Sequence, residues 1–338
     1  MNKRIAVAGN MIVDTIYSIE SYPKLGELTT IDDNIMKATG GAVCNNIVNL
    51  AKLDPTLHLT ALGVVGNDQN GKFIEETLNL YKNIDTSLIA HEGMTSFTAV
   101  MSENVSKERT FFQFRGSNAK FSERHIDWEK LKDVKILHLG YILLLDELDK
   151  VDEIYGTKMA RLLANAQQKG IKTSIDVVSD AGNRFKKIVP PALKYTDYCI
   201  INELEAEQTV GIKLRDENGI INENILPVLA ALKKLGVAKW AVIHSPEGGY
   251  GLDCETGKFV KQKSLHLPNG FIKGTTGAGD AFCSGVLYGA YKDKSLLESI
   301  ELGIGCAACS LSKAGASDGV LNVEETVNLY KKMRDFKN

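Results

Sequence analysis

Short apolar segments that read as β-strands alternate along the chain with longer segments that have helical periodicity. The strand-like segments are residues 4–9, 58–65, 135–140, 171–176, 197–201 and 239–243. The helical segments are residues 41–53, 71–81, 156–169, 203–210, 224–235, 279–292 and 295–314. Such alternation is typical of a mainly parallel sheet with helices on both faces. The sequence therefore predicts an α/β fold with three layers, α/β/α.

Polar residues and glycines lie at or just beyond the ends of the predicted strands. They are Gly9, Asp14, Gly140, Asp176, Asn202 and His244. Open parallel sheets bind their ligands outside the carboxyl ends of the strands. We therefore expect these residues to share one crevice.

Two segments interrupt the alternation, at about 12–38 and about 94–116. In the second segment, residues 95–101 and 109–115 are rich in β-forming residues and are separated by a polar turn, which indicates a hairpin. We predict that the two segments pair into a small sheet of their own.

Composition agrees with a cytoplasmic enzyme that folds without disulfides, although composition alone would not identify one. The chain has 338 residues, is 44% hydrophobic and carries a net charge of only −2, with no cluster of basic residues, so neither nucleic acid nor a membrane is expected as a partner. No apolar run approaches a membrane span. The six cysteines lie mostly in apolar stretches, and we interpret Cys306 and Cys309 as buried thiols rather than a metal site.

A glycine-rich turn at residues 273–280 (KGTTGAGD) runs into the predicted helix 279–292. Free backbone N–H groups of Gly277, Ala278 and Gly279 can hold phosphate charge at the start of that helix, and Asp280 can accept a proton from an attacking hydroxyl. This combination predicts a kinase. From the glycines alone, a tight strand-to-helix turn capped by Asp280 is an equally good interpretation.

The chain resembles the ribokinase-like sugar kinases, the PfkB carbohydrate kinase family, over nearly its whole length. Residues 40–51 (GGAVCNNIVNLA) with 63–71 (GVVGNDQNG) look like the first family signature, and residues 275–282 (TTGAGDAF) look like the second. The resemblance implies one ribokinase-like domain over residues 1–338. It also implies that the segments at about 12–38 and 94–116 form a discontinuous β-sheet lid that excludes water. An edge hairpin or a homodimer contact is the alternative, and one sheet can serve as both lid and dimer contact.

The family activity implied is ATP-dependent transfer of the γ-phosphoryl group to a hydroxyl of a small carbohydrate, with Mg²⁺. Asp280 would be the base, and Gly277, Ala278 and Gly279 would bind the developing charge. The substrate-binding candidates are Asp14, Gly40, Gly41, Asn45 and Arg115. The carboxylate of Asp14 can accept sugar O–H groups, and the missing side chains at Gly40 and Gly41 let a ligand approach the backbone. Arg115 is a contact for an anionic substituent or, equally, an exposed arginine of the lid.

The nucleotide-binding candidates implied by the resemblance are Asn202, Glu205, His244, Gly249, Thr275, Gly277 and Gly279. Glu205 would organise Mg²⁺ through water, although Asn202 followed by acids is also an ordinary helix cap. His244 and Pro246 depart from the phosphate loop of the relatives, and Pro246 removes a backbone donor. Gly274 replaces an aspartate that helps relatives to hold a monovalent cation, so activation by K⁺ is a doubtful expectation.

Three other functions compete with a sugar kinase. They are a nucleoside or vitamin-alcohol kinase of the same superfamily, a catalytically idle sugar-binding regulator, and a dinucleotide-dependent oxidoreductase. The retained Asp280 argues against the regulator. Residues 9–14 (GNMIVD) lack the three-glycine turn that an oxidoreductase would need after its first strand.

Overall fold

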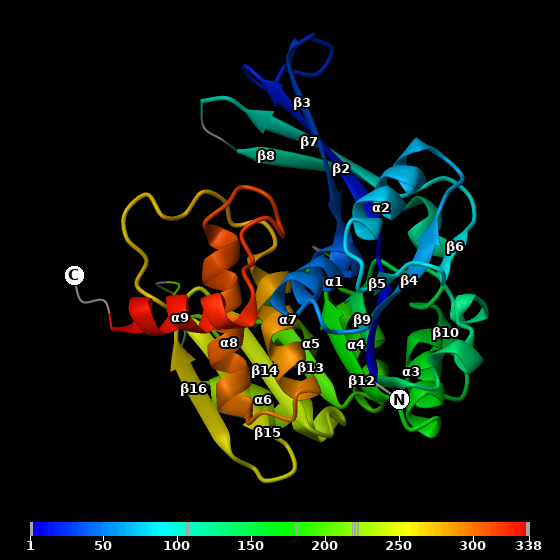
Figure 1. Ribbon diagram of the computed structural model, residues 1–338, viewed down its shortest axis with the longest axis vertical. Coiled ribbons are helices and arrows are strands. Elements are labelled where there is room, and N and C mark those ends of the chain that lie inside the picture. The colour runs from blue at the N-terminus through cyan, green and yellow to red at the C-terminus, as the bar shows by residue number, and fades with distance from the viewer. Residues whose placement is uncertain are drawn as a thin grey trace.

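The structure is a computed structural model that describes residues 3–105, 108–179, 182–217, 219, 221 and 223–335. Its centre is a ten-stranded sheet in the order β16-β15-β14-β13-β12-β9-β1-β4-β5, with β6 also paired to β4 (Figure 1). The strands of this sheet are β1 Arg4–Gly9, β4 Leu59–Val65, β5 Ile84–Asp85, β6 Ile89–His91, β9 Val134–Ile142, β12 Lys172–Val177, β13 Tyr198–Asn202, β14 Trp240–Ser245, β15 Gly248–Asp253 and β16 Phe259–Lys263. All pairings are parallel except β14 with β15 and β15 with β16. The predicted mainly parallel sheet is confirmed.

Helices cover both faces of the sheet, as the alternation predicted (Figure 1). They are α1 Gly41–Leu53, α2 Gln69–Asn79, α3 Lys158–Gln168, α4 Phe185–Leu193, α5 Glu203–Val210, α6 Ile225–Leu235, α7 Ala278–Tyr291, α8 Leu296–Leu311 and α9 Val323–Arg334. Three 3₁₀ turns (Gly116–Lys120, Glu123–His125, Trp128–Leu131) and the pair β10 Val151–Asp152 and β11 Gly156–Thr157 complete the described elements.

Strand β1 shows why both faces must be covered. Ala6 and Ala8 belong to the core formed with α3 to α6, whereas Ile5 and Val7 belong to the core formed with α1 and α7. All four side chains are fully buried. Alternate side chains of a strand point to opposite faces, so a strand that is apolar throughout needs helices on both sides.

The two interrupting segments form a separate four-stranded sheet in the order β3-β2-β7-β8, which confirms the predicted pairing. Its strands are β2 Ile12–Ile19, β3 Ile31–Gly40, β7 Phe97–Glu103 and β8 Arg109–Phe114. Figure 1 shows this sheet projecting from the main body on the side where α1 and α7 begin. Residues 31–38 of β3 are exposed, and so is all of β8.

Within the described part of the chain, none of the helices combines the length and the apolar character that crossing a lipid bilayer requires.

Candidate active site

The predicted base, Asp280, lies in the first turn of α7 and is buried, with 6% of its surface exposed. The residue that precedes the helix, Gly277, has a φ of +79°, in the region that only glycine adopts easily. A Cβ atom at Gly277 would also collide with the backbone of Ala316. The sequence therefore needs glycine here to turn the chain sharply into α7.

Three side chains donate hydrogen bonds to the Asp280 carboxylate. Asn45 Nδ2 lies 2.8 Å from Oδ2, Asn46 Nδ2 lies 3.4 Å from Oδ1, and the Tyr141 hydroxyl lies 3.0 and 3.2 Å from the two oxygens. Burial raises the pKa of Asp280 to about 6, while the hydrogen bonds from Asn45, Tyr141 and Asn46 act to lower it. A carboxyl group with that pKa is ionised at neutral pH and is still basic enough to accept a proton.

The backbone amides before Asp280 are largely available to a ligand. Ala278 N–H donates to the carbonyl of Thr275 over 3.3 Å, whereas within the described residues the N–H groups of Gly277 and Gly279 have no acceptor. These two amides lie at the positive end of a 14-residue helix. Of the three predicted donors, two are therefore free.

The predicted substrate residues gather around the start of α1. Gly40 ends β3 and lies so close to Asp14 of β2 that a Cβ atom at Gly40 would collide with the Asp14 carboxylate. Gly41 has a φ of +84°, and a Cβ atom there would lie 2.5 Å from the carbonyl oxygen of Asn10. Burial raises the pKa of Asp14, and a hydrogen bond from Thr98 opposes that shift. Asn45, which also lies near the start of α1, donates a hydrogen bond to Asp280, so the predicted substrate residues adjoin the predicted base.

Two arginines link the small sheet to the rest of the molecule. Arg115 Nη1 donates to the carbonyl of Leu143 over 3.1 Å and lies 3.5 Å from Asp146, so it contacts the loop after β9. Arg109 on β8 donates to the hydroxyl of Thr276, in the turn before α7, over 3.3 Å. The small sheet therefore reaches the glycine-rich turn.

On the other side of Asp280, Asn202 and Glu205 form a reciprocal cap of α5. Asn202 Oδ1 accepts from Glu205 N–H over 2.9 Å, and the Glu205 carboxylate accepts from Asn202 N–H over 2.9 Å, from Asn202 Nδ2 over 2.7 Å and from the hydroxyl of Ser179 over 2.9 Å. Burial raises the pKa of Glu205 to about 7. Burial also raises that of Asp176, and the charges of Glu205 and Asp280 add to this effect.

Two of the remaining nucleotide candidates, His244 and Gly249, lie against the first turns of α7 and are packed more tightly than an open loop. The ring of His244 lies 5.0 Å from that of Phe282 and borders Gly279, and burial lowers its pKa to about 4, so the imidazole is neutral. Gly249 pairs with His244 across β14 and β15, and a Cβ atom there would lie 2.6 Å from Ile300. Gly249 is therefore needed for packing, whatever else it contacts.

Sequence reasoning missed Tyr141, Asn46 and Asn10. Tyr141 follows Gly140, which was expected in the crevice, but no motif marked the tyrosine itself. Asn46 lies beside Asn45 in the first signature. The Oδ1 atom of Asn10 is buried without a partner among the described residues, next to Gly41, so it could accept from a ligand.

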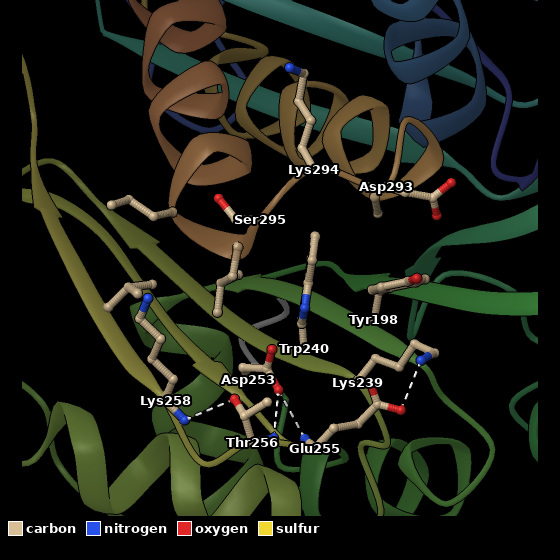
Figure 2. Close-up of a pocket in the computed structure, with 14 residues that line it drawn as sticks. Tyr198, Lys239, Trp240, Asp253, Glu255, Thr256, Lys258, Asp293, Lys294 and Ser295 are labelled. Carbon is tan, nitrogen blue, oxygen red and sulfur yellow. Dashed lines mark hydrogen bonds and ion pairs between the residues drawn. The ribbon is translucent and has the colours of Figure 1, made fainter.

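A hollow of about 410 Å³ lies at the opposite end of the sheet (Figure 2). It is lined by Tyr198 and Trp240, the first residues of β13 and β14, whose rings lie 5.3 Å apart. Asn202 and His244 lie at or near the other ends of the same strands. Lys239 and Glu255, which also line the hollow, pair with each other at 2.9 Å. None of the predicted site residues lines this hollow, so it is separate from the candidate active site.

Comparison with known proteins agrees with this geometry. The pfkB family carbohydrate kinase model matches residues 2–322. The chain is 24% identical to the ribokinase of Haemophilus influenzae, covering 97% of this chain and 98% of that protein. It is also 24% identical to the probable fructokinase-7 of Arabidopsis thaliana, covering 96% and 92%. The fold matches that of Arabidopsis thaliana ribokinase complexed with ribose and ATP, with a TM-score of 0.79 and 21% identity over 98% of this chain and 99% of that chain. The resemblance seen in the two sequence signatures is thus confirmed, and the chain belongs to the PfkB family of carbohydrate kinases, which transfer a phosphoryl group to an alcohol.

Proposed function

We propose that this protein transfers the γ-phosphoryl group of ATP to a hydroxyl group of a small carbohydrate, with Asp280 as the base. One observation carries the proposal: a buried carboxylate stands directly after two free backbone amides at the start of a long helix. An alcohol and a phosphoryl group placed there would each meet the group that their reaction needs.

In this mechanism Asp280 accepts the proton of the acceptor hydroxyl as its oxygen attacks the γ-phosphorus in line. The N–H groups of Gly277 and Gly279 stabilise the charge on the transferring group, helped by the dipole of α7. Ala278 N–H joins them if its long bond to Thr275 opens. Asp14, Gly41 and Asn45 hold the other hydroxyl groups of the sugar.

The residues present fit magnesium with the nucleotide. Asp176, Glu205 and Asp280 are buried carboxyl groups, and the charge of Asp280 helps to raise the pKa of the other two, so a divalent cation beside them would relieve this repulsion. Three hydrogen bonds from the protein already occupy Glu205, so it would hold Mg²⁺ through bound water. When bound, Mg²⁺ neutralises charge on the phosphates. His244, Gly249 and Thr275 would border the nucleotide.

Gly274 supports a reaction without K⁺. The turn offers no carboxylate at this position, and a Cβ atom there would lie 3.1 Å from the backbone of Ala314, so a larger side chain would require that backbone to shift slightly.

We infer that the small sheet acts as a lid over the sugar. The contact between Arg109 and Thr276 supports this inference, because it brings β8 to the turn where the phosphoryl group would lie. Arg115 would meet an anionic substituent of the substrate if its bond to Leu143 were exchanged.

The exposed face of β3 would suit a homodimer formed through the lid. Six buried free thiols suit a reducing cytoplasm.

The test is a screen for ADP release with MgATP across sugars, sugar acids and nucleosides, with and without K⁺. A sugar or sugar acid should give a strong signal, and Asp280→Asn should lower its kcat by about 100-fold or more while the protein stays folded. A nucleoside as the best substrate would replace the carbohydrate assignment. Sugar binding in calorimetry without any turnover would indicate the idle regulator. Undiminished turnover by Asp280→Asn would remove Asp280 as the base.

A further inference from the structure

Tyr141 lies at the end of β9 in an unusual backbone conformation. Its φ is +61°, and that of Leu143, two residues later, is +86°. Residues other than glycine rarely adopt this region, and where they do the surrounding structure must hold them there. The preceding Gly140 is one such constraint, because a Cβ atom there would collide with Ala42 of α1. The chain at this strand end is therefore fixed tightly against α1.

The result of this conformation is that the Tyr141 hydroxyl faces the carboxylate of Asp280, at 3.0 Å from Oδ2 and 3.2 Å from Oδ1. Burial, together with the charges of Asp280, Asp176 and Glu205, keeps the pKa of the phenol well above its usual value. The phenol is therefore neutral, and its proton can only be donated to the carboxylate.

We propose that Tyr141 is a positioning residue for Asp280, fixing the orientation of the carboxylate that would accept the proton of the acceptor alcohol. This proposal rests on the proposed function, in which Asp280 is the base. Asn45 and Asn46 hold the same carboxylate from α1, and Tyr141 holds it from β9. Between them the three donors fix its plane, which a single donor would leave free to rotate.

Burial opposes ionisation of Asp280 and makes this role necessary. The carboxyl groups of Asp176 on β12 and Glu205 on α5 face Asp280 closely enough for its charge to raise their pKa values, and so does the neutral thiol of Cys283 on α7. In the described residues around Asp280, no cation lies within ion-pair distance of its carboxylate. Hydrogen bonds from the neutral donors Asn45, Asn46 and Tyr141 are therefore the protein's own contribution to stabilising the ionised carboxylate.

The experiment compares the pH dependence of kcat/KM in the wild type and in Tyr141→Phe, which removes only the hydroxyl. Loss of a donor to the carboxylate should move the acid limb of the profile to higher pH by about one pH unit. With a wild-type limb near pH 6, ionisation alone then lowers kcat/KM about fivefold at pH 6 and leaves it almost unchanged at pH 8.

The matched control is Tyr288→Phe. Tyr288 is on α7 as well, and its hydroxyl also donates to a carboxylate, that of Asp54, over 3.2 Å. This variant should keep the wild-type acid limb. If Tyr141→Phe keeps it too, with an unchanged melting temperature, the proposal is wrong.

Two further measurements keep the outcome clear. If Tyr141→Phe does not fold, 3-fluorotyrosine at position 141 preserves the packing and donates more strongly, so it should move the acid limb downward. The ¹³C NMR titration of the Asp280 carboxyl carbon, assigned by its absence in Asp280→Asn, needs no turnover. The midpoint of this titration should shift to higher pH in Tyr141→Phe even if no substrate is found. The measurement therefore separates failure of this proposal from failure of the proposed function. An unshifted titration would overturn the role of Tyr141.

Discussion

Asp280→Asn removes the proposed base, yet relative to the wild type this variant should gain stability as pH rises from acid to neutral. Burial raises the pKa of Asp280 from 3.8 to about 6. A group whose pKa is higher in the folded state favours folding when protonated, and its stabilising effect is lost as pH rises from the unfolded to the folded pKa. At pH values above 6 the ionised Asp280 therefore costs about 3 kcal/mol of folding free energy, a cost that asparagine does not carry.

Asparagine will also disturb the hydrogen bonds from Asn45, Asn46 and Tyr141, since its own amide cannot accept from all three. That loss does not depend on pH, because asparagine does not titrate. The informative quantity is thus the difference in unfolding free energy between Asp280→Asn and the wild type, measured by urea denaturation at two pH values. It should grow in favour of the variant by about 1.4 kcal/mol between pH 5 and pH 7.5.

Asp54→Asn is the control. Burial acts to raise the pKa of Asp54, but hydrogen bonds from Thr56 and Lys292 outweigh it and hold the pKa below its usual value of 3.8. Asp54 is therefore ionised in both the folded and the unfolded state above pH 5, so the difference between this variant and the wild type should stay constant between pH 5 and pH 7.5. A difference for Asp280→Asn that stays flat across the same range would refute the claim that the folded protein holds a destabilised carboxylate at the start of α7.

Three other changes test the surroundings of Asp280. Arg109→Ala should lower kcat/KM about 10-fold without altering the melting temperature, because the contact of Arg109 with Thr276 is exposed. The control Arg124→Ala breaks a surface pair with Glu92 and should leave the kinetics unchanged. Gly277→Ala should cost about 3 kcal/mol in a denaturant melt, and Gly270→Ala, which has a similar φ of +76° but open space around it, should cost only about 1 kcal/mol. Asn202→Ala and Asn322→Ala each remove a helix cap worth about 1 kcal/mol, yet only Asn202→Ala should raise the Mg²⁺ concentration needed for half-maximal turnover.

The elements that the sequence predicted are those whose local pattern agrees with their environment. The helix at α7 followed from its helical periodicity, and the buried strands followed from short apolar runs. Helix α4 was missed because Pro190 and Pro191 lie inside it and argue against a helix, yet its buried residues Ile188 and Val189 pack well enough to override that preference. Strands β15 and β16 were missed because one is rich in glycine and the other in lysine.

In the candidate site, too, only the residues marked by a local sequence pattern could be predicted. Asp280 and the glycines before it could be found because they form one short motif. Tyr141 could not, since its role depends on a left-handed backbone conformation and on contacts with residues far away in the chain. Whether Arg115 and Gly249 bind ligands stays a prediction, because each already has a structural partner in Leu143 or Ile300.

The bond from Asn45 to Asp280 joins residues that are 235 positions apart. During synthesis the small sheet and α1 are complete long before α7 leaves the ribosome, so a nascent chain can bear much of the proposed sugar-binding surface while it still lacks Asp280, the proposed base. Enzymatic turnover in a translation reaction should therefore appear late and abruptly, as a report that the two distant parts of the polypeptide have met.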